Sequence, residues 1–200
     1  MKKEIKSKKQ KTTRFLDGWT FARMLRGGAA RLSAKADTVN NLNVFPVPDG
    51  DTGDNMRMTI EGGVAALEGM DSGNLGEVSQ ALSKGMLLGA RGNSGVILSQ
   101  FFAGVGRGLA TCDKADVSTV GNALREGVKQ AYASVLTPME GTILTVAREA
   151  VDYAVSRITP KSSIQTLFSD LEKEMKASLA RTPDLLEALK EAGVIDSGGA

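Results

Sequence analysis

The most chemically distinctive stretch of the sequence is Asn43–Asn55, NVFPVPDGDTGDN, which places Asp49, Asp51 and Asp54 within six residues. Two prolines stiffen the approach to this turn, and two glycines let the backbone reverse within it. Like charges held this close repel each other, so a rigid turn that gathers three carboxylates is typical of a cation site. Carboxylate oxygens favour a hard cation, Mg²⁺ or Ca²⁺. The alternative is an ordinary solvated Asp/Gly turn, but the apolar residues before it indicate attachment to the core.

The spacing of the turn excludes an EF-hand calcium loop. Counted from Asp49, such a loop needs glycine at its sixth position and glutamate at its twelfth, where this chain has Asp54 and Ile60. Magnesium remains, because it uses one or two protein carboxylates and completes its coordination with water and phosphate oxygens. The turn therefore predicts the magnesium-binding part of a nucleotide site.

A second candidate is the turn Gly89–Gly95, GARGNSG, between two predicted helices. Backbone N–H groups at the start of the second helix, capped by Asn93 or Ser94, would form an anion site. The chain has no Gly-Lys pair, which excludes a Walker A loop. A purely structural turn remains the alternative, and Arg91 would either neutralise phosphate or point into solvent.

Similar turns occur at Thr52–Asn55, Glu140–Thr142 and Asp196–Gly199. Each could simply cap a helix, or it could contact a ligand. Two helices separate each consecutive pair of the turns near positions 50, 92, 141 and 197. Turns separated by an even number of antiparallel helices lie at the same end, so we expect all four to meet in one site.

Apolar residues recur at helical spacing along the whole chain, and no alternating strand pattern stands out. The sequence therefore predicts an all-α fold, a closed barrel or bundle of about eight antiparallel helices with the nucleotide site at one end. The expected caps are Asp17, Asp116, Ser162 or Ser163, and Thr182. The expected helices cover residues 19–32, 56–67, 75–88, 94–109, 117–136, 141–158, 163–181 and 183–192.

Composition narrows the classes of function. The 200 residues contain no histidine, which excludes imidazole ligands and a Ser-His-Asp triad, and Cys112 alone forms neither an internal disulfide nor a thiolate metal cluster. Residues 1–15 carry seven basic side chains against one glutamate, a net charge of +6, and are expected to be a disordered leader before a domain at 16–200.

This leader lacks the apolar segment of a secretory signal. It could contact nucleic acid or anionic lipid, but we expect a solubilising tail and no nucleic-acid partner. No apolar run is long enough to predict a membrane span, so we expect a cytoplasmic protein. The final polar turn suggests a fragment of a longer chain.

Four motifs together resemble the nucleotide-binding domain shared by the dihydroxyacetone kinase L subunit and the bacterial fatty acid kinase ATP-binding subunit, more closely the latter. They cover residues 42–56, 88–100, 140–147 and 193–199. The resemblance extends over about residues 17–199. It implies a barrel of eight antiparallel helices with ATP or ADP and two Mg²⁺ ions at one rim.

The resemblance also implies roles for individual residues. Asp49 and Asp51 would be the catalytic magnesium ligands, with Asn43 as the third ligand and Asp54 supporting them. The expected nucleotide-binding residues are Thr52, Gly53, Asn55, Ser94 and Gly95 at the phosphates, and Thr142, Asp196, Ser197 and Gly198 along the nucleotide.

In that family a separate acyl-binding protein presents a fatty acid, whose carboxylate takes the γ-phosphate of ATP. Because a carboxylate is ionised at neutral pH and needs no general base, the absence of histidine does not oppose this role. The alternatives are a dihydroxyacetone kinase subunit and a nucleotide-sensing module without catalysis. A homodimer would form through regions beyond the chain.

Overall fold

The computed structural model describes residues 13–200, which are mostly helical, as predicted. Residues 1–12, where most of the expected basic leader falls, lie outside the described residues. The described elements are β1 (Phe15–Asp17), α1 (Gly18–Ser33), α2 (Ala36–Asn40), α3 (Thr52–Ala65), α4 (Leu75–Gly89), α5 (Gly92–Leu109), β2 (Lys114–Asp116), α6 (Val117–Ala133), α7 (Ile143–Ser156), α8 (Ile164–Leu185) and α9 (Glu187–Ala192).

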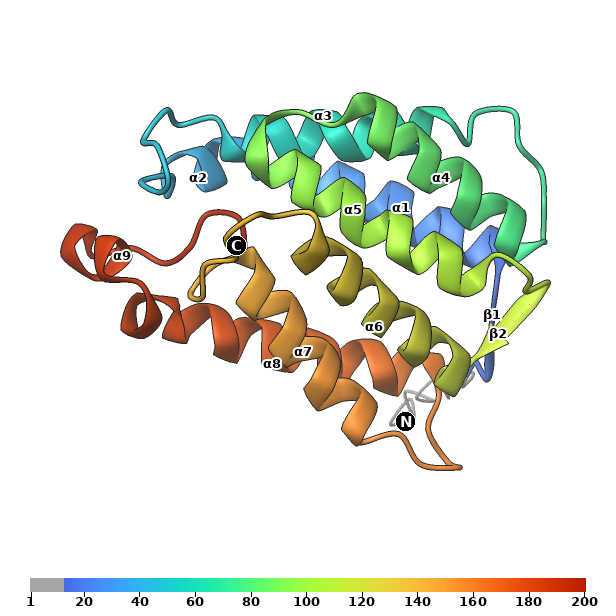
Figure 1. Cartoon of the computed structure of the whole chain (residues 1–200). Helices are drawn as coiled ribbons and strands as arrows, with labels where there is room; N and C mark the ends of the chain where they lie inside the picture. Colours follow the sequence, from blue (N-terminus) through green and yellow to red (C-terminus); the bar gives the residue numbers. More distant parts are fainter. Residues whose placement is uncertain (1–12) are drawn as a thin grey trace, which may run out of the picture.

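The long helices form a bundle in which α1, α3, α4 and α5 lie on one side and α6, α7 and α8 on the other (Figure 1). Helices α5 and α6 pack directly against each other and join the two groups. The start of α3, the α4–α5 turn, the α6–α7 connection and the C-terminus all lie at the left end in Figure 1, while β1 and β2 lie at the right. None of the helices in residues 13–200 is both long and apolar enough to cross a bilayer.

A two-stranded antiparallel sheet was not predicted. Its strands pair Leu16 with Ala115 and are only three residues long, too short for an alternating pattern to be visible. Each strand runs directly into a helix, α1 or α6, so the sheet ties the starts of these two helices together.

The predicted aspartate caps are confirmed. Asp17 accepts a hydrogen bond from the backbone N–H of Thr20, and Asp116 accepts one from Thr119, each at 2.8 Å. These bonds stabilise the ionised form and lower the pKa of both carboxyl groups. Of the two serines proposed for α8, Ser163 is the cap.

The predicted helix start at Thr182-Pro183 is wrong, because α8 continues through both residues. Pro183 has no N–H to give to the carbonyl oxygen of Leu179, four residues earlier. The hydroxyl of Thr182 donates to that carbonyl at 2.8 Å instead. The lost backbone bond is thus replaced, and the helix passes through the proline.

Other boundaries also differ from the prediction. Helix α6 ends at Ala133 and α7 begins at Ile143, so residues 134–142 form a loop, and the short helix α2 was missed. The count of two helices between the turns near 141 and 197 was wrong, because the expected helices and the structure both have three there. The turns still meet, because α9 lies at the end where α8 stops and the chain then returns toward the start of α7 (Figure 1).

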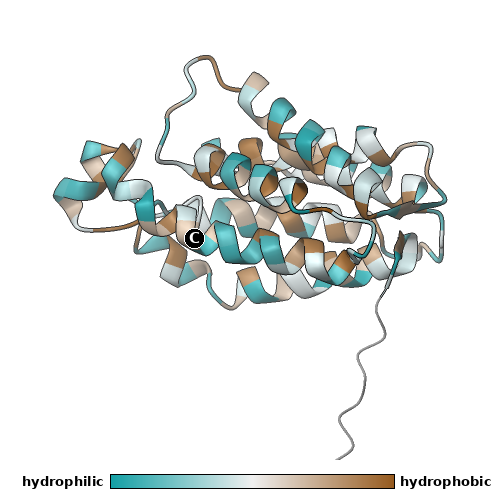
Figure 2. Ribbon diagram, turned by 90° about the horizontal axis from the view of Figure 1, so that it is seen from below, coloured by the Kyte–Doolittle hydropathy of each residue, from teal (hydrophilic) through white to brown (hydrophobic). Residues whose placement is uncertain are grey.

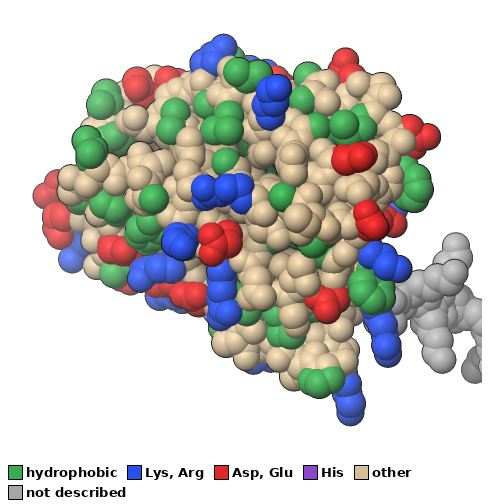
Figure 3. Space-filling model, turned by 45° about the vertical axis from the view of Figure 1, so that its right-hand side comes forward, with side chains coloured by type: hydrophobic (Ala, Val, Ile, Leu, Met, Phe, Trp, Pro, Cys, Tyr) green, Lys and Arg blue, Asp and Glu red, His purple; other side chains and the backbone are tan. Residues whose placement is uncertain are grey.

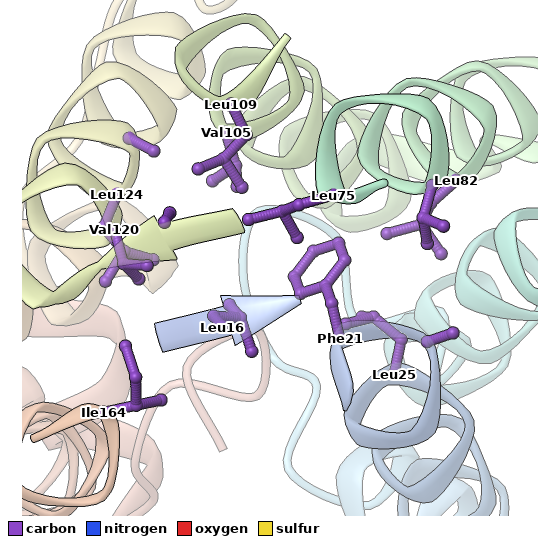
Figure 4. Close-up of a cluster of buried hydrophobic side chains, with 14 of the residues drawn as sticks. Leu16, Phe21, Leu25, Leu75, Leu82, Val105, Leu109, Val120, Leu124 and Ile164 are labelled. Atoms are coloured by element: carbon purple, nitrogen blue, oxygen red, sulfur yellow. The ribbon is translucent and has the colours of Figure 1, made fainter. Parts of the chain in front are cut away.

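The hydrophobic core is centred near the small sheet. Leu16 is fully buried between side chains of α1, α4, α5, α6 and α8 (Figure 4). Hydrophobic and hydrophilic residues alternate along the helices (Figure 2), as in amphipathic helices that bury one face. On the face in Figure 3, acidic and basic side chains are interspersed. Because this core cluster surrounds the small sheet, it stabilises the end of the bundle opposite the converging turns.

Replacing Leu16 by alanine should lower the free energy of unfolding by about 3 kcal/mol, since it empties a fully buried site. Leu136→Ala is the control, because that side chain is fully exposed, and it should change stability by less than about 0.5 kcal/mol. Urea unfolding of both variants measures the difference. Equal effects would contradict the placement of the core.

Candidate functional site

A cavity of about 690 Å³ opens at the end where the turns meet, within the roughly 300–1,000 Å³ range typical of small-ligand sites. It brings together residues from α3, α5, the α6–α7 connection, the start of α7 and the C-terminal turn. Ten of the twelve predicted site residues line it: Asn43, Asp49, Asp51, Thr52, Asn55, Ser94, Thr142, Asp196, Ser197 and Gly198. The geometry thus brings the predicted turns to one place.

The two carboxylates proposed as metal ligands are exposed at this cavity. Within residues 13–200, neither Asp49 nor Asp51 has a recorded hydrogen bond or ion pair through its carboxylate. Asp54 differs, because its oxygens accept from Asn40 at 3.0 Å and from Arg57 at 3.1 Å. The Asn40 bond, followed by Arg57, lowers the pKa of Asp54. Asp49 and Asp51 thus have carboxylate oxygens without a partner in residues 13–200, whereas Asp54 already has partners.

This donor set fits magnesium. No cluster of three or more histidine, cysteine or acidic side chains with metal-binding geometry occurs in the described part of the chain. Two free carboxylates beside a cavity suit an ion that takes few protein ligands and completes its octahedron with phosphate oxygens and water.

Asn43 holds the acidic turn from inside. It is only 7% exposed, and its side-chain oxygen accepts from the Thr52 hydroxyl at 2.8 Å and from the N–H groups of Asp51 and Thr52 at 3.3 Å. Its side-chain nitrogen donates to the carbonyl of Val47 at 2.9 Å. Both ends of the turn are therefore hydrogen-bonded to the Asn43 side-chain amide. To bind a metal, the oxygen of this amide would have to lose its bonds to these donors.

Asn40 completes the support of α3 and was missed by the sequence analysis. Its oxygen accepts from the N–H groups of Gly53 at 2.7 Å and Asp54 at 3.2 Å. A Cβ at Gly53 would lie 2.2 Å from the carbonyl oxygen of Ala36, so glycine lets α2 pack against this helix start. The asparagines just before the acidic turn were the available signal. The first N–H groups of α3 are consequently satisfied within the chain.

Backbone N–H groups around the start of α7 also have acceptors within the protein. The hydroxyl of Thr142 accepts from Leu144 N–H at 3.4 Å, and that of Thr145 accepts from Gly141 N–H at 2.8 Å. The backbone of Ile143 acts on the nearby Asp196 carboxylate and lowers its pKa, against the larger effect of burial. Little donor capacity is left here for an added anion.

The start of α5 is different, because Arg91 precedes it without making a side-chain cap. Among residues 13–200, no side chain accepts from the N–H groups of Gly92, Asn93 or Ser94, and all three residues line the cavity. The predicted cap by Asn93 or Ser94 is therefore wrong. Arg91 is exposed and donates to the carbonyl of Ala90. Free N–H groups at the positive end of a helix dipole form an anion site.

Thr59, also missed, joins the acidic helix to this turn. It is fully buried, donates to the carbonyl of Asn55 at 2.7 Å and accepts from the N–H of Arg91 at 3.2 Å. A Cβ at Gly95 would lie 2.3 Å from its hydroxyl oxygen, so Gly95 permits close packing of α3 and α5. A single threonine within a helix gives no recognisable sequence signal.

The C-terminal turn closes another side of the cavity. Ser197, 4% exposed, donates to the Thr52 hydroxyl at 3.3 Å. Asp196, 5% exposed, accepts from Gly199 N–H at 2.8 Å, and its own N–H donates to Thr182 at 3.0 Å. Burial raises the pKa of Asp196 to about 6, although backbone hydrogen bonds oppose the shift.

Comparison with known proteins decides the family: the DAK2 domain matches residues 46–200. The chain belongs to the DAK2 domain family. It therefore contains a nucleotide-binding module of the type found in the dihydroxyacetone kinase L subunit. This agrees with a cavity that combines free carboxylates with a free helix start.

Relatives share the sequence over most of this chain. Protein YloV of Bacillus subtilis is 50% identical over 186 residues, which is 93% of this chain and 34% of YloV. Uncharacterized protein SSP1546 of Staphylococcus saprophyticus is 47% identical over 184 residues, 92% of this chain and 33% of the relative. The chain thus spans about a third of the length of these relatives.

Asn43→Ala should lower the free energy of unfolding by about 2–3 kcal/mol even in EDTA, because it leaves buried donors without an acceptor. Asn93→Ala, at an exposed position, is the control and should change little. Denaturant unfolding without metal measures both. A stable Asn43→Ala protein that loses only its response to Mg²⁺ would instead identify Asn43 as a ligand.

Asp196 should make stability depend on pH. Its pKa is raised from 3.8 to about 6 in the folded chain, so the folded state holds the proton more tightly. Its contribution to stability is full below pH 3.8 and is lost as the pH rises through 6, by up to about 3 kcal/mol. Unfolding of wild type and Asp196→Asn between pH 4 and 7 tests this, and a constant difference would refute it.

Proposed function

We propose that this chain is the ATP-binding domain of a fatty acid kinase and transfers the γ-phosphate of ATP, with Mg²⁺, to a fatty acid carboxylate. The observation that carries the proposal is the meeting of two free carboxylates, Asp49 and Asp51, with the uncapped start of α5 in one cavity. Membership of the DAK2 family supports the nucleotide part. The acyl acceptor rests on the resemblance to the fatty acid kinase subunit.

Asp49 and Asp51 would hold two Mg²⁺ ions, which supply charge neutralisation to the phosphates when bound. The backbone N–H groups of Gly92, Asn93 and Ser94 would hold phosphate oxygens at the start of α5. Thr142 and the Asp196–Gly198 turn would line the rest of the nucleotide. Direct phosphate contacts by Thr52, Gly53, Asn55 and Gly95 stay predictions, as does a metal bond from Asn43.

The acceptor would come from a separate acyl-binding protein in the cytoplasm. A fatty acid carboxylate is already ionised at neutral pH, so an oxygen lone pair can attack phosphorus as the bond to ADP breaks, without a base. Phosphoryl transfer of this kind depends on positioning and on charge neutralisation rather than on a protein nucleophile. The chain's lack of histidine is compatible with this chemistry.

Two alternatives make different predictions. A dihydroxyacetone kinase subunit would exchange phosphate only with the dihydroxyacetone-binding subunit, and a nucleotide sensor would bind ATP·Mg²⁺ without transfer. Incubating the full-length protein with labelled ATP and each acceptor subunit separates them. We expect label on the acyl group alone, and label on dihydroxyacetone would overturn the acyl assignment.

Asp49→Ala and Asp51→Ala should each weaken magnesium-dependent nucleotide binding by about 100-fold or more, because each removes a direct ligand. Thermal unfolding should stay close to wild type, since both side chains are exposed and have no recorded partners. Asp37→Ala on α2, an exposed carboxylate outside the cavity, is the matched control. Isothermal titration with ATP, with and without Mg²⁺, decides. Wild-type affinity in both variants would remove the proposed metal site.

A further inference from the structure

The strap, residues 134–141 of the connection between α6 and α7, forms one wall of the cavity. Its middle makes little contact with the rest of the protein, because Leu136 is fully exposed and Met139 is 43% exposed. Residues 134–137 and Met139 nevertheless line the cavity. The place of this wall therefore depends on how the two ends of the strap are held.

The first end continues from α6. The N–H of Ser134 donates to the carbonyl of Gln130 at 3.1 Å, its hydroxyl donates to that of Ala131 at 2.7 Å, and Val135 N–H donates to Tyr132 at 3.3 Å. These bonds continue the helical pattern for two residues past Ala133 and leave the following residues without such support.

The second end is held by the carboxylate of Glu140. One oxygen accepts from the Tyr132 hydroxyl of α6 at 3.2 Å. The other accepts from the Thr145 hydroxyl at 2.6 Å and from Arg148 at 2.7 Å, both on α7. One side chain thus joins the end of the strap to both helices that flank it.

The residues that follow Glu140 strengthen this attachment. Gly141 has a φ of +80°, and a Cβ there would lie 2.8 Å from the Cβ of Leu186. The hydroxyl of Thr142 donates to the carbonyl of Met139 at 2.8 Å. The backbone therefore turns tightly at this point, next to the end of α8, in a conformation that favours glycine.

We propose that Glu140 is a positioning residue that, through its bonds to α6 and α7, keeps the strap where it forms a wall of the nucleotide cavity. The inference rests on the proposed function for its link to the nucleotide. Glu140 does not itself line the cavity, so its effect on binding passes through the strap. Its ion pair with Arg148 is about half exposed, so the pair contributes little to global stability.

The test compares Glu140→Ala with Glu172→Ala in the full chain. Glu172 pairs with Lys176 at 2.6 Å on the exposed face of α8, away from the cavity, and gives a matched loss of an ion pair. Hydrogen–deuterium exchange of residues 134–141 without nucleotide, and titration with Mg²⁺ and a non-hydrolysable ATP analogue, are the two measurements.

In Glu140→Ala, the strap amides should exchange about tenfold faster and the analogue should bind about tenfold more weakly, while Glu172→Ala changes neither. Glu140→Gln should recover part of both effects, since its amide oxygen still accepts from Tyr132 or Thr145. Similar thermal unfolding of all variants would show that the fold is intact.

Unchanged strap exchange in Glu140→Ala would overturn the inference. Faster exchange with wild-type nucleotide affinity would also overturn it, because the strap would then have no part in binding. A wild-type chain that binds no nucleotide would refute the proposed function instead, and the exchange data alone would then decide whether Glu140 holds the strap.

Discussion

The site depends on one buried amide. The side-chain oxygen of Asn43 accepts from the Thr52 hydroxyl and from two backbone N–H groups, so the acidic turn and the start of α3 share one anchor. Ser197 extends this chain of hydrogen bonds to the C-terminal turn through Thr52. All three side chains are at most 7% exposed, where an unmade hydrogen bond is costly. The backbone that carries the exposed carboxylates of Asp49 and Asp51 is therefore fixed by buried hydrogen bonds.

A second constraint concerns the backbone N–H groups at the starts of the helices, some of which already have acceptors within the protein. Three helices begin at the cavity, but side chains of this protein already accept from the first three N–H groups of α3 and from the Leu144 N–H of α7. At the start of α5, whose first residues line the cavity, no side chain among residues 13–200 accepts from the N–H groups of Gly92, Asn93 or Ser94. The positive end of α5 and the negative carboxylates of Asp49 and Asp51 therefore border the same cavity. An ion of charge +2 next to an oxyanion fits this pattern of charge.

The sequence was sufficient to predict the helical class and the meeting of the turns near 50, 92 and 141, because helical periodicity and short connections leave few arrangements. The place of the C-terminal turn did not follow from the helix count, since three helices separate it from the turn near 141. It failed where a local rule was outweighed by tertiary contacts. Thr182-Pro183 resembles a helix start, yet the Thr182 hydroxyl replaces the missing proline bond and also accepts from Asp196. Asn40 and Thr59 were missed because their roles depend on residues that only folding brings near. The cap expected at Ser94 is absent for the opposite reason, since this helix start stays open toward the cavity.

The most direct test of this account is a crystal structure of the protein with Mg²⁺ and a non-hydrolysable ATP analogue. The account predicts metal bound to Asp49 and Asp51, and phosphate oxygens on the N–H groups at the start of α5. A nucleotide bound elsewhere, with both carboxylates pointing into solvent, would contradict it.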